Sequence, residues 1–192
     1  MSPGPVGKGS DSVGQDGKPV VKESLDRRLF VALRTRWHLQ PLELALISLS
    51  RSGNWGLFWL GLAFAMWIGG AHYGRAMAIF MPVTVWVTLA VNYAVKEKLR
   101  RERPVSSESG LEPLVGVPAS KSFPSSHAAM SFAAATVFTY FEPSSWYFFY
   151  ALALVMSWSR VYAGVHYPSD VVAGTAIGLV MGGLWVLFLN WV

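Results

Sequence analysis

Five apolar runs separated by short polar segments occupy most of the chain after residue 54. They cover residues 55–71, 76–95, 128–141, 146–158 and 171–192. Several approach the roughly 20 apolar residues that an α-helix needs to cross the hydrocarbon core of a bilayer. The third and fourth runs are shorter, and reach that length only if their helices continue into the flanking polar residues. The pattern predicts an all-α integral membrane protein, a compact bundle of about five transmembrane helices.

The alternative is a soluble all-helical protein with buried apolar helices. Five such runs would leave that protein too little polar surface, so we favour the membrane interpretation. Three tryptophans at the ends of runs, Trp55, Trp146 and Trp191, agree with it. Tryptophan is enriched where a membrane-spanning segment meets the membrane–water interface.

Two further helices are expected before the first apolar run. Residues 25–38 place Arg among Leu, Phe, Val and Trp at helical spacing, which is typical of a helix lying in the membrane interface. Residues 42–49 are apolar but too short to cross a bilayer. We expect both to be interfacial or partly inserted helices on the cytoplasmic side. Pro41 marks the break between them.

The first 24 residues differ in composition from the remainder of the chain. They are rich in Gly, Ser, Pro and Lys, and they lack the apolar core of a secretory signal peptide. This composition predicts a disordered tail over residues 1–24 and a single membrane-embedded domain over residues 25–192. The chain has no Cys, which excludes a disulfide framework and a thiolate metal site.

The distribution of basic residues predicts the orientation in the cell membrane. If residues 25–50 do not cross, fifteen of the 16 Lys and Arg share a face with the tail and the 96–122 and 159–170 loops. Arg75 alone falls on the opposite face, with the C-terminus. The positive-inside rule makes the basic face cytoplasmic. The net charge of +5 could suggest a nucleic-acid partner, but the basic residues flank apolar runs and form no stripe, so none is expected.

Three polar segments on the basic face carry candidate chemistry. The first is KEKLRRERP, residues 96–104. If the second apolar helix continues past the membrane, Lys96 and Arg103 lie seven residues apart on one side of it, and Pro104 stops it. Taken alone, this segment would be better explained as the snorkelling basic end of a transmembrane helix.

The second segment is SFPSSHAAM, residues 122–130. Ser125 or Ser126 is expected to cap the helix that follows Pro124. A helix N-terminus is also an anion site, because its backbone N–H groups have no partner within the helix. His127 falls in the first turn, where it could donate or accept a proton. Taken alone, it would be better explained as a structural histidine.

The third segment is SRVYAGVHYPSD, residues 159–170. From Ser122 to the C-terminus, Glu142, Arg160 and Asp170 are the only formally charged side chains. Ionisable residues among apolar segments are functional candidates in a membrane protein. His166 precedes Asp170 closely enough for its ring to reach the carboxylate. A carboxylate on one ring nitrogen fixes the tautomer and leaves the other nitrogen free to attack.

Together, the three segments predict a phosphate-binding site. Three fixed cations and the amides of a helix start suit a group with several negative oxygens. A histidine backed by an aspartate can serve as a nucleophile, and a second histidine as a general acid. No carboxylate cluster is available to hold a metal, so we expect a metal-free mechanism without a cofactor.

The spacing of these residues resembles the three motifs of the type 2 phosphatidic acid phosphatase superfamily, which includes lipid phosphatases and vanadium haloperoxidases. The matching residues are Lys96, Arg103 and Pro104, then Pro124, Ser125, Ser126 and His127, then Ser159, Arg160, His166 and Asp170. The resemblance covers residues 96–170, and the surrounding apolar helices also fit it. So many specified residues in this order make an accidental match far less plausible than for a lone short motif.

The resemblance implies a role for each matching residue. His166 would attack phosphorus and form a phosphohistidine, Asp170 would orient it, and His127 would protonate the leaving oxygen and then activate water. The phosphoryl oxygens would be held by Lys96, Arg103, Ser125 and Arg160. The family usually has Gly at the position of Ser126. The backbone N–H of Ser126 can still bind phosphate, while the hydroxymethyl group of its side chain either narrows the pocket or adds a hydrogen-bond donor.

The resemblance also implies an integral-membrane lipid phosphatase that hydrolyses a phosphomonoester or diphosphate of a bilayer lipid. A lipid phosphotransferase would use the same residues, and a lipid-binding protein that kept the pocket is the non-enzymatic alternative. A cytoplasmic site suits a prenyl-linked sugar phosphate, phosphatidylglycerol phosphate or phosphatidate. Recycling of a polyprenyl diphosphate would need an outward-facing site. The layout is similar to small actinobacterial members, some of which dephosphorylate decaprenylphosphoryl-ribose 5-phosphate.

Three features stay open at this point. The loop at residues 105–122 either frames the substrate entrance or is a plain connector. The small residues of the last run could pack a partner helix, although packing within the monomer is favoured: Gly174, Gly178, Gly182 and Gly183. No feature fixes the oligomeric state, and we assign no catalytic role to His38 or His72.

Overall fold

The computed structural model describes residues 24–35, 40–107 and 112–191, and within these ranges the chain forms helices and loops with no strand. The all-α fold class is therefore confirmed for this part of the chain. The predicted disordered tail falls outside the described residues, apart from Ser24. His38 also lies outside them.

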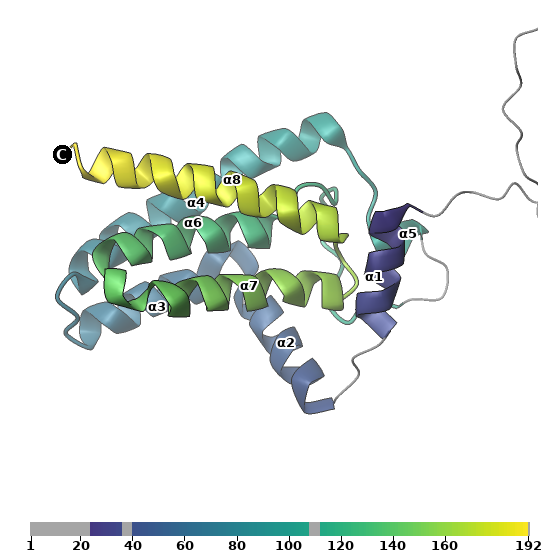
Figure 1. Cartoon of the computed structure of the whole chain (residues 1–192), viewed down its shortest axis with the longest axis horizontal. Coiled ribbons are helices and arrows are strands. Elements are labelled where there is room, and N and C mark those ends of the chain that lie inside the picture. Colours follow the sequence, from purple (N-terminus) through teal and green to yellow (C-terminus); the bar gives the residue numbers. More distant parts are fainter. Residues whose placement is uncertain (1–23, 36–39, 108–111, 192) are drawn as a thin grey trace, which may run out of the picture.

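Four long helices run side by side along the molecule: α4 (Gly74–Leu99), α6 (Ser126–Phe141), α7 (Trp146–Tyr162) and α8 (Pro168–Leu189). A shorter helix, α3 (Leu57–Ile68), packs on α4. In Figure 1, α6 lies between α4, α7 and α8, and it contacts all three. Most of its residues are buried, including a run of alanines that lets its neighbours approach closely.

Three glycines of α8 explain its close contact with α6. A Cβ added at Gly174 would lie 2.4 Å from the carbonyl oxygen of Ser125, and one at Gly178 would lie 2.4 Å from that of Ala129. At Gly182 the nearest atom would be the Cβ of Thr136, at 2.6 Å. These three glycines therefore pack within the monomer, as expected. Gly183 is the exception, because a Cβ there would meet open space.

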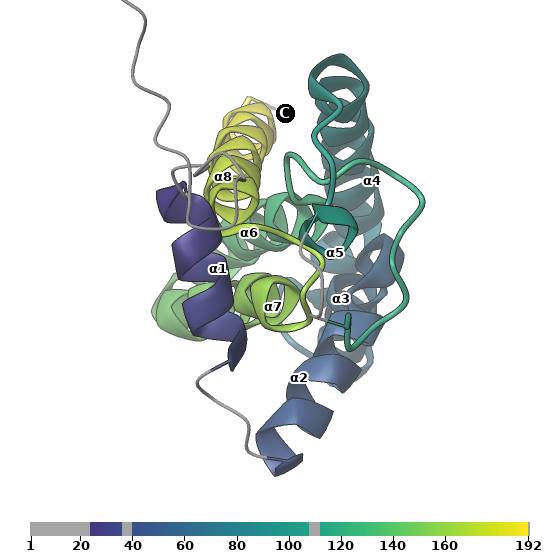
Figure 2. The ribbon, with the colours of Figure 1, turned by 90° about the vertical axis from the view of Figure 1, so that its right-hand side faces the viewer.

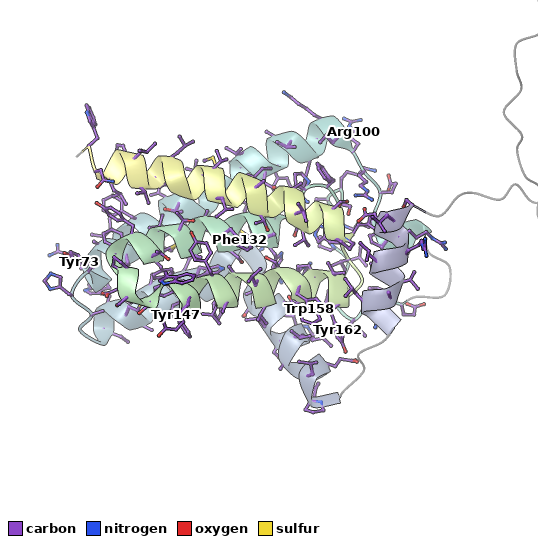
Figure 3. All side chains as sticks on the ribbon, in the orientation of Figure 1. Tyr73, Arg100, Phe132, Tyr147, Trp158 and Tyr162 are labelled. Atoms are coloured by element: carbon purple, nitrogen blue, oxygen red, sulfur yellow. The ribbon has the colours of Figure 1, made fainter. Side chains whose placement is uncertain are left out.

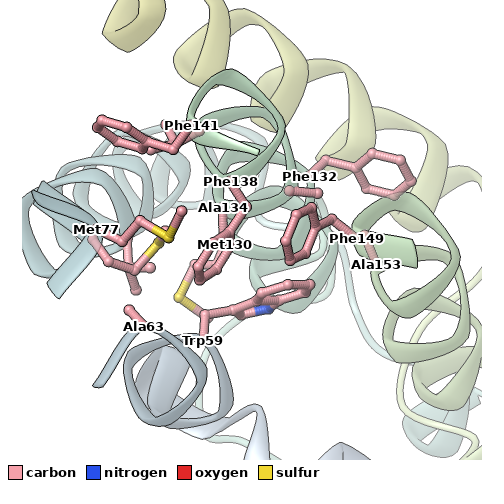
Figure 4. Packing of buried hydrophobic residues seen from close by; sticks show 14 residues of the cluster. Trp59, Ala63, Met77, Met130, Phe132, Ala134, Phe138, Phe141, Phe149 and Ala153 are labelled. Atoms are coloured by element: carbon pink, nitrogen blue, oxygen red, sulfur yellow. The ribbon is translucent and has the colours of Figure 1, made fainter. Parts of the chain in front are cut away.

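The hydrophobic core lies between α3, α4, α6 and α7 (Figure 4). Phe138 of α6 stacks on Phe149 of α7 with ring centroids 4.9 Å apart, and the centroid of the Trp59 ring lies 6.0 Å from that of Phe138. The indole nitrogen of Trp59 donates to the Ser131 hydroxyl at 3.0 Å. This bond satisfies the polar edge of a fully buried aromatic side chain.

The two helices expected before the first apolar run are present as α1 (Leu25–Thr35) and α2 (Gln40–Ser52). Figure 2 shows α1 lying across one end of the bundle, where Phe30 packs edge-on against Tyr167. Pro41 is the second residue of α2, so it does not mark the break between the helices. Proline is tolerated in a first turn because that turn needs no N–H donor there. The interfacial placement of both helices stays a prediction.

Short elements connect the longer ones. They are η1 (Asn54–Gly56), α5 (Pro104–Ser107) and η2 (Pro143–Ser145). The first apolar run therefore does not form one continuous helix: Trp55, the middle residue of η1, adopts a left-handed conformation with φ 56°, and α3 begins only at Leu57. Figure 3 places Tyr73 and Tyr147 at one end of the bundle and Arg100 and Tyr162 toward the other.

Two helices among the described residues are long and apolar enough to span a membrane, α4 with 26 residues and α8 with 22. The other three candidates, α3, α6 and α7, have 12, 16 and 17 residues. At about 1.5 Å per residue they are shorter than a hydrocarbon core of about 30 Å. The prediction of five spans is thus supported for two helices and stays a prediction for three.

Candidate active site

The predicted site residues gather at the end of the bundle where α4 and α7 end and α6 and α8 begin (Figure 1). A cavity of about 270 Å³ opens there. Six of the eight predicted residues line it: Lys96, Arg103, Ser126, His127, Arg160 and His166. Ser125 and Asp170 are fully buried and do not line the cavity.

Asp170 is the anchor of the site. Its Oδ2 lies 3.3 Å from Nδ1 of His166, accepts a bond from the backbone N–H of Tyr167 at 2.8 Å, and accepts another from the Ser122 hydroxyl. Its Oδ1 accepts from Nη1 of Arg101 at 2.9 Å. Both oxygens are thus occupied, so the carboxylate has a fixed direction relative to the His166 ring.

The contacts of His166 define its tautomer. Its Nε2 lies 3.3 Å from Nη1 of Arg103. A guanidinium group only donates hydrogen bonds, so Nε2 must carry the lone pair and Nδ1 the hydrogen that points to Asp170. This tautomer leaves the nitrogen on the cavity side able to act as a nucleophile.

His166 is also held in its neutral form. Burial of the ring keeps the pKa of His166 well below its ordinary value of 6.5. The positive charges of Arg103, Arg160 and Lys96 lower that pKa further. Asp170 acts in the opposite direction, but its charge is shared with Arg101, and we expect burial and the three cations to prevail.

Arg103 reaches the site from a loop and not from the predicted extension of α4. The helix ends at Leu99, because Arg100 adopts a left-handed conformation with φ 47° and its N–H closes the last turn on the carbonyl of Lys96. Pro104 accordingly begins α5 and does not stop α4. The prediction that Lys96 and Arg103 share one helix face is therefore wrong, although both side chains line the cavity.

The two cations of this segment organise the loop that precedes α6. Lys96 donates to the carbonyl of Lys121 at 2.9 Å, and Nε of Arg103 donates to that of Ser120 at 2.9 Å. Arg103 also donates to the carbonyl of Val165 at 2.8 Å. Burial lowers the pKa of Arg103 to about 10, which leaves it charged at neutral pH.

Arg160 is the third buried cation of the cavity and is 1 % exposed. Its Nη1 donates to the hydroxyl of Ser50 on α2. Its Nε is buried and has no hydrogen-bond partner among the residues that the structure describes. Three buried cations around one cavity are costly without an anion, so the arrangement suits a ligand with several negative oxygens.

His127 makes its hydrogen bond through Nε2, whereas His166 is held through Nδ1. Its Nε2 lies 3.1 Å from the carbonyl oxygen of Ser50. A carbonyl only accepts, so Nε2 carries the hydrogen and Nδ1 remains for proton exchange. Ser125 is the N-cap of α6, as predicted, and its N–H donates to the backbone carbonyl of Asp170 at 2.9 Å. The starts of α6 and α8 are thereby joined directly.

Ser126 replaces the glycine that the resemblance predicts, and its hydroxyl is used. It accepts a bond from Nδ2 of Asn92 at 2.9 Å. The same nitrogen donates to the carbonyl of Pro124 at 3.2 Å. Because the Ser126 oxygen is the acceptor in this bond, its own hydrogen is left for a ligand in the cavity.

The sequence alone did not identify four residues that support the site: Ser50, Asn92, Arg101 and Ser122. Arg101 and Ser122 lie within or beside the predicted motifs, and Asn92 is a lone amide in an apolar run, which is itself a signal. Ser50 gave no local signal, because it meets His127 only through the tertiary fold.

The loop before α6 contributes to the cavity wall. Gly116, Pro118 and Ser120 line it. Of the predicted entrance loop, residues 108–111 lie outside the described residues. Within the described ranges, no group of three or more His, Cys, Asp or Glu side chains is placed to hold a metal ion. The metal-free mechanism stays a prediction.

Residues 77–192 match the family model of the PAP2 superfamily, so the chain belongs to this superfamily. The match includes all eight predicted site residues. It leaves out α1, α2, η1 and α3, from which Ser50 and Trp55 reach the site.

Known proteins similar to this chain include lipid phosphatases. A decaprenylphosphoryl-5-phosphoribose phosphatase of Mycolicibacterium smegmatis is 33% identical over 129 residues, which cover 66% of this chain and 68% of the relative. An undecaprenyl-diphosphatase of Sulfolobus acidocaldarius is 28% identical over 117 residues, covering 60% of this chain and 54% of the relative. The chain spans about 60% of the length of several of the curated relatives that it matches.

The fold is similar to that of a solved membrane protein. A transmembrane PAP2-type phosphatidylglycerolphosphate phosphatase of Bacillus subtilis superimposes with a TM-score of 0.70 at 24% sequence identity. The superposition covers 86% of this chain and 84% of the other. At this identity the likeness concerns the fold alone.

Proposed function

We propose that the chain is a metal-independent phosphatase that hydrolyses a phosphate ester of a membrane lipid through a phosphohistidine on His166. The observation that carries this proposal is the state of His166: a neutral ring whose Nε2 lone pair faces a cavity with three buried cations. Its other nitrogen is fixed by Asp170. Membership of the PAP2 superfamily supports it.

In the first step, Lys96, Arg103 and Arg160 bind the phosphoryl oxygens, together with Ser126. Nη1 of Arg103 exchanges its contact with Nε2 for a phosphoryl oxygen. The lone pair of Nε2 then forms a bond to phosphorus while the bond to the lipid oxygen breaks. For this step His127 is in its imidazolium form, with a hydrogen on each ring nitrogen; its Nδ1 proton goes to the leaving oxygen and the ring becomes neutral.

In the second step, His127 takes a proton from water, and the resulting hydroxide attacks phosphorus. The bond between phosphorus and Nε2 breaks, so His166 returns to its neutral form and inorganic phosphate leaves. Asp170 accepts the Nδ1–H bond throughout and stabilises the positive charge on the phosphorylated ring.

The cavity wall supports a lipid substrate. Besides the polar residues, the cavity is lined by Trp55, Leu89, Tyr93 and Met130. Trp55 of η1 is 66% exposed and Tyr93 of α4 is 38% exposed, so the apolar part of the lining reaches the surface of the bundle. The phosphate would occupy the cationic side while the hydrocarbon chain leaves past Trp55 and Tyr93 toward the bilayer.

The substrate that we favour is a prenyl-linked sugar phosphate, with phosphatidylglycerol phosphate second. The similarity to decaprenylphosphoryl-5-phosphoribose phosphatases supports the first. The basic residues around the site support a cytoplasmic active site, which suits lipids made inside the cell. A polyprenyl diphosphate is the alternative, because relatives also include undecaprenyl-diphosphatases.

Phosphate release by purified protein in detergent tests the proposal. The panel holds a prenyl-phosphoryl pentose phosphate, phosphatidylglycerol phosphate, phosphatidate and a polyprenyl diphosphate, each with EDTA and beside H166A. We expect EDTA-resistant release from at least one lipid, abolished in H166A. Release that persists in H166A would overturn the phosphohistidine mechanism, and release that EDTA removes would overturn metal independence. Folded protein that releases nothing would overturn the phosphatase activity.

A further inference from the structure

Arg101 lies outside the cavity yet contacts three parts of the site's framework. Its Nη1 donates to Asp170 Oδ1 at 2.9 Å and to the Ser169 hydroxyl at 2.6 Å. Its Nη2 donates to Oδ2 of Asp26, on α1, at 2.6 Å. The guanidinium also lies over the Tyr167 ring, 4.2 Å from its centroid. One side chain thus joins the first helix to the start of the last.

Helix α1 holds the same segment by a second set of contacts. Oδ1 of Asp26 accepts from the backbone N–H of Ser169 at 3.0 Å, and Oδ2 accepts from its hydroxyl at 2.5 Å. One turn along α1, Phe30 is fully buried against Tyr167, with ring centroids 5.5 Å apart. Residues 167–169, directly before Asp170, are therefore fixed from α1 by both polar and apolar contacts.

A buried carboxylate needs compensation, and Arg101 provides it without touching the cavity. Asp170 is fully buried, while the Arg101 side chain is 33% exposed. The neutral His166 supplies a hydrogen bond but no positive charge. Arg101 therefore supplies a formal positive charge in direct contact with Asp170, and Asp26 prevents its guanidinium from turning away.

We propose that Arg101 is a positioning residue: held by Asp26 of α1, it fixes the Asp170 carboxylate and through it the orientation and protonation of His166. This inference rests on the proposed role of His166 as nucleophile. It also gives α1 a function, because the site is complete only when this helix is docked on the end of the bundle.

The effect on protonation has a definite sign. The ionisable groups around His166 and Asp170 are Asp26 of α1, Lys96 of α4, Arg101, Arg103 and Tyr167 of the loops, His127 of α6 and Arg160 of α7. Replacing Arg101 leaves the other cations in place. It removes one positive charge and frees the negative charge of Asp170 to act on His166. Both changes favour the imidazolium form, so the protonation of His166 moves to higher pH.

The test compares R101A, R101K and D26N with K98A, which removes a cation from an exposed position of the same segment. In R101A we expect kcat to fall on the order of 10²-fold, the penalty of a misplaced reacting group. KM should change little, because Arg101 does not line the cavity. The acid limb of the pH profile of kcat/KM should move to higher pH.

R101K and D26N separate positioning from a general loss of structure. R101K keeps the charge but loses the forked geometry, so the acid limb should stay near that of the wild type while kcat remains reduced. D26N should lower kcat less than R101A, because it weakens the hold on Arg101 without removing it.

The outcomes are distinguishable from failure of the proposed function. If H166A is inactive but R101A matches K98A in kcat and in pH profile, the positioning role is overturned and the nucleophile stands. An unchanged acid limb in an R101A variant with reduced kcat would also contradict it. If H166A keeps its activity, the proposed function itself fails.

Discussion

At the scale of single residues, the two histidines of the site are bound through opposite ring nitrogens. His166 donates from Nδ1 to a carboxylate, which is a strong acceptor that stabilises positive charge. His127 donates from Nε2 to the backbone carbonyl of Ser50, a neutral acceptor. The first arrangement suits a ring that becomes positively charged when it is phosphorylated, and the second suits a ring that exchanges a proton.

The lowered pKa of His166 predicts the pH dependence of the reaction. Protonation removes the Nε2 lone pair, so kcat/KM should fall as the pH drops through the pKa of this ring, which lies well below 6.5. We expect the acid limb of kcat/KM that His166 causes to lie below pH 6.5, while loss of the His127 proton that the leaving oxygen needs would give a separate alkaline limb. If the acid limb of kcat/KM lies above pH 6.5 and disappears when a residue other than His166 is replaced, the limb belongs to that residue and its assignment to His166 is wrong.

The same shift has a consequence for stability. The unfolded chain binds a proton at His166 near pH 6.5, whereas the folded chain does so only at lower pH. Its contribution to folding stability is therefore fully present above pH 6.5 and is lost as the pH falls. Thermal unfolding of wild type and H166N between pH 8 and pH 5 measures this contribution, and we expect the wild type to lose more stability on acidification.

At the scale of elements, the contact between α6 and α8 sets the position of Asp170 relative to Ser125. We expect G174A to separate these helices, because the new Cβ would lie 2.4 Å from the Ser125 carbonyl oxygen. The cost should be about 1–3 kcal/mol of unfolding free energy, the usual range for overpacking. Phosphate release should fall as well, because the carbonyl of Asp170 accepts the N–H of Ser125.

G183A is the matched control on the same helix. A Cβ at Gly183 meets open space, so this variant should retain the stability and activity of the wild type. Thermal unfolding in detergent, measured on both variants, makes the comparison. If G174A and G183A lose the same amount of stability, the loss comes from placing alanine anywhere in α8 and not from the contact with Ser125.

The apolar pattern predicted the positions of the long helices well but not where several of them end. Burial decides which segments become helices, and burial can be inferred from hydrophobicity. The ends depend on single backbone conformations, such as the positive φ of Trp55 and Arg100, which neither residue type favours. The turn at Trp55 is an example. At the next residue, Gly56, the backbone packs so closely on α4 that a Cβ would lie 2.2 Å from the Val85 side chain. Tertiary contact thus fixes this turn, and no local pattern reveals it.

The candidate site likewise combines residues that the local sequence predicts with contacts that depend on the tertiary fold. Residues within the motifs were predicted because their types and spacing carry the chemistry. The supporting contacts of Ser50 with His127 and Arg160 join residues that are 77 and 110 positions apart, and serine is too common for such pairs to be predicted. Asp26 is similar, since its partner Ser169 lies 143 positions along the chain.

At the scale of the whole molecule, the two ends of the bundle should lie on opposite sides of the membrane. The chain has no Cys, so a single introduced Cys reports its own side. Val117 is 45% exposed in the loop beside the cavity, and Ser144 is exposed at the other end. In intact cells we expect a membrane-impermeant maleimide to label S144C and to leave V117C unlabelled until the cells are permeabilised. Labelling of V117C in intact cells would overturn the cytoplasmic orientation.

The family match begins at residue 77, yet parts of the working site come from before it. Ser50 contacts the candidate site residues His127 and Arg160, Asp26 holds Arg101, and Trp55 borders the cavity. A fragment cut at the family boundary would keep every motif residue and lose all three contacts. The segment before residue 77 can therefore influence substrate preference in this chain without any change in the motifs. Exchanging that segment between relatives is a direct way to transfer such a preference.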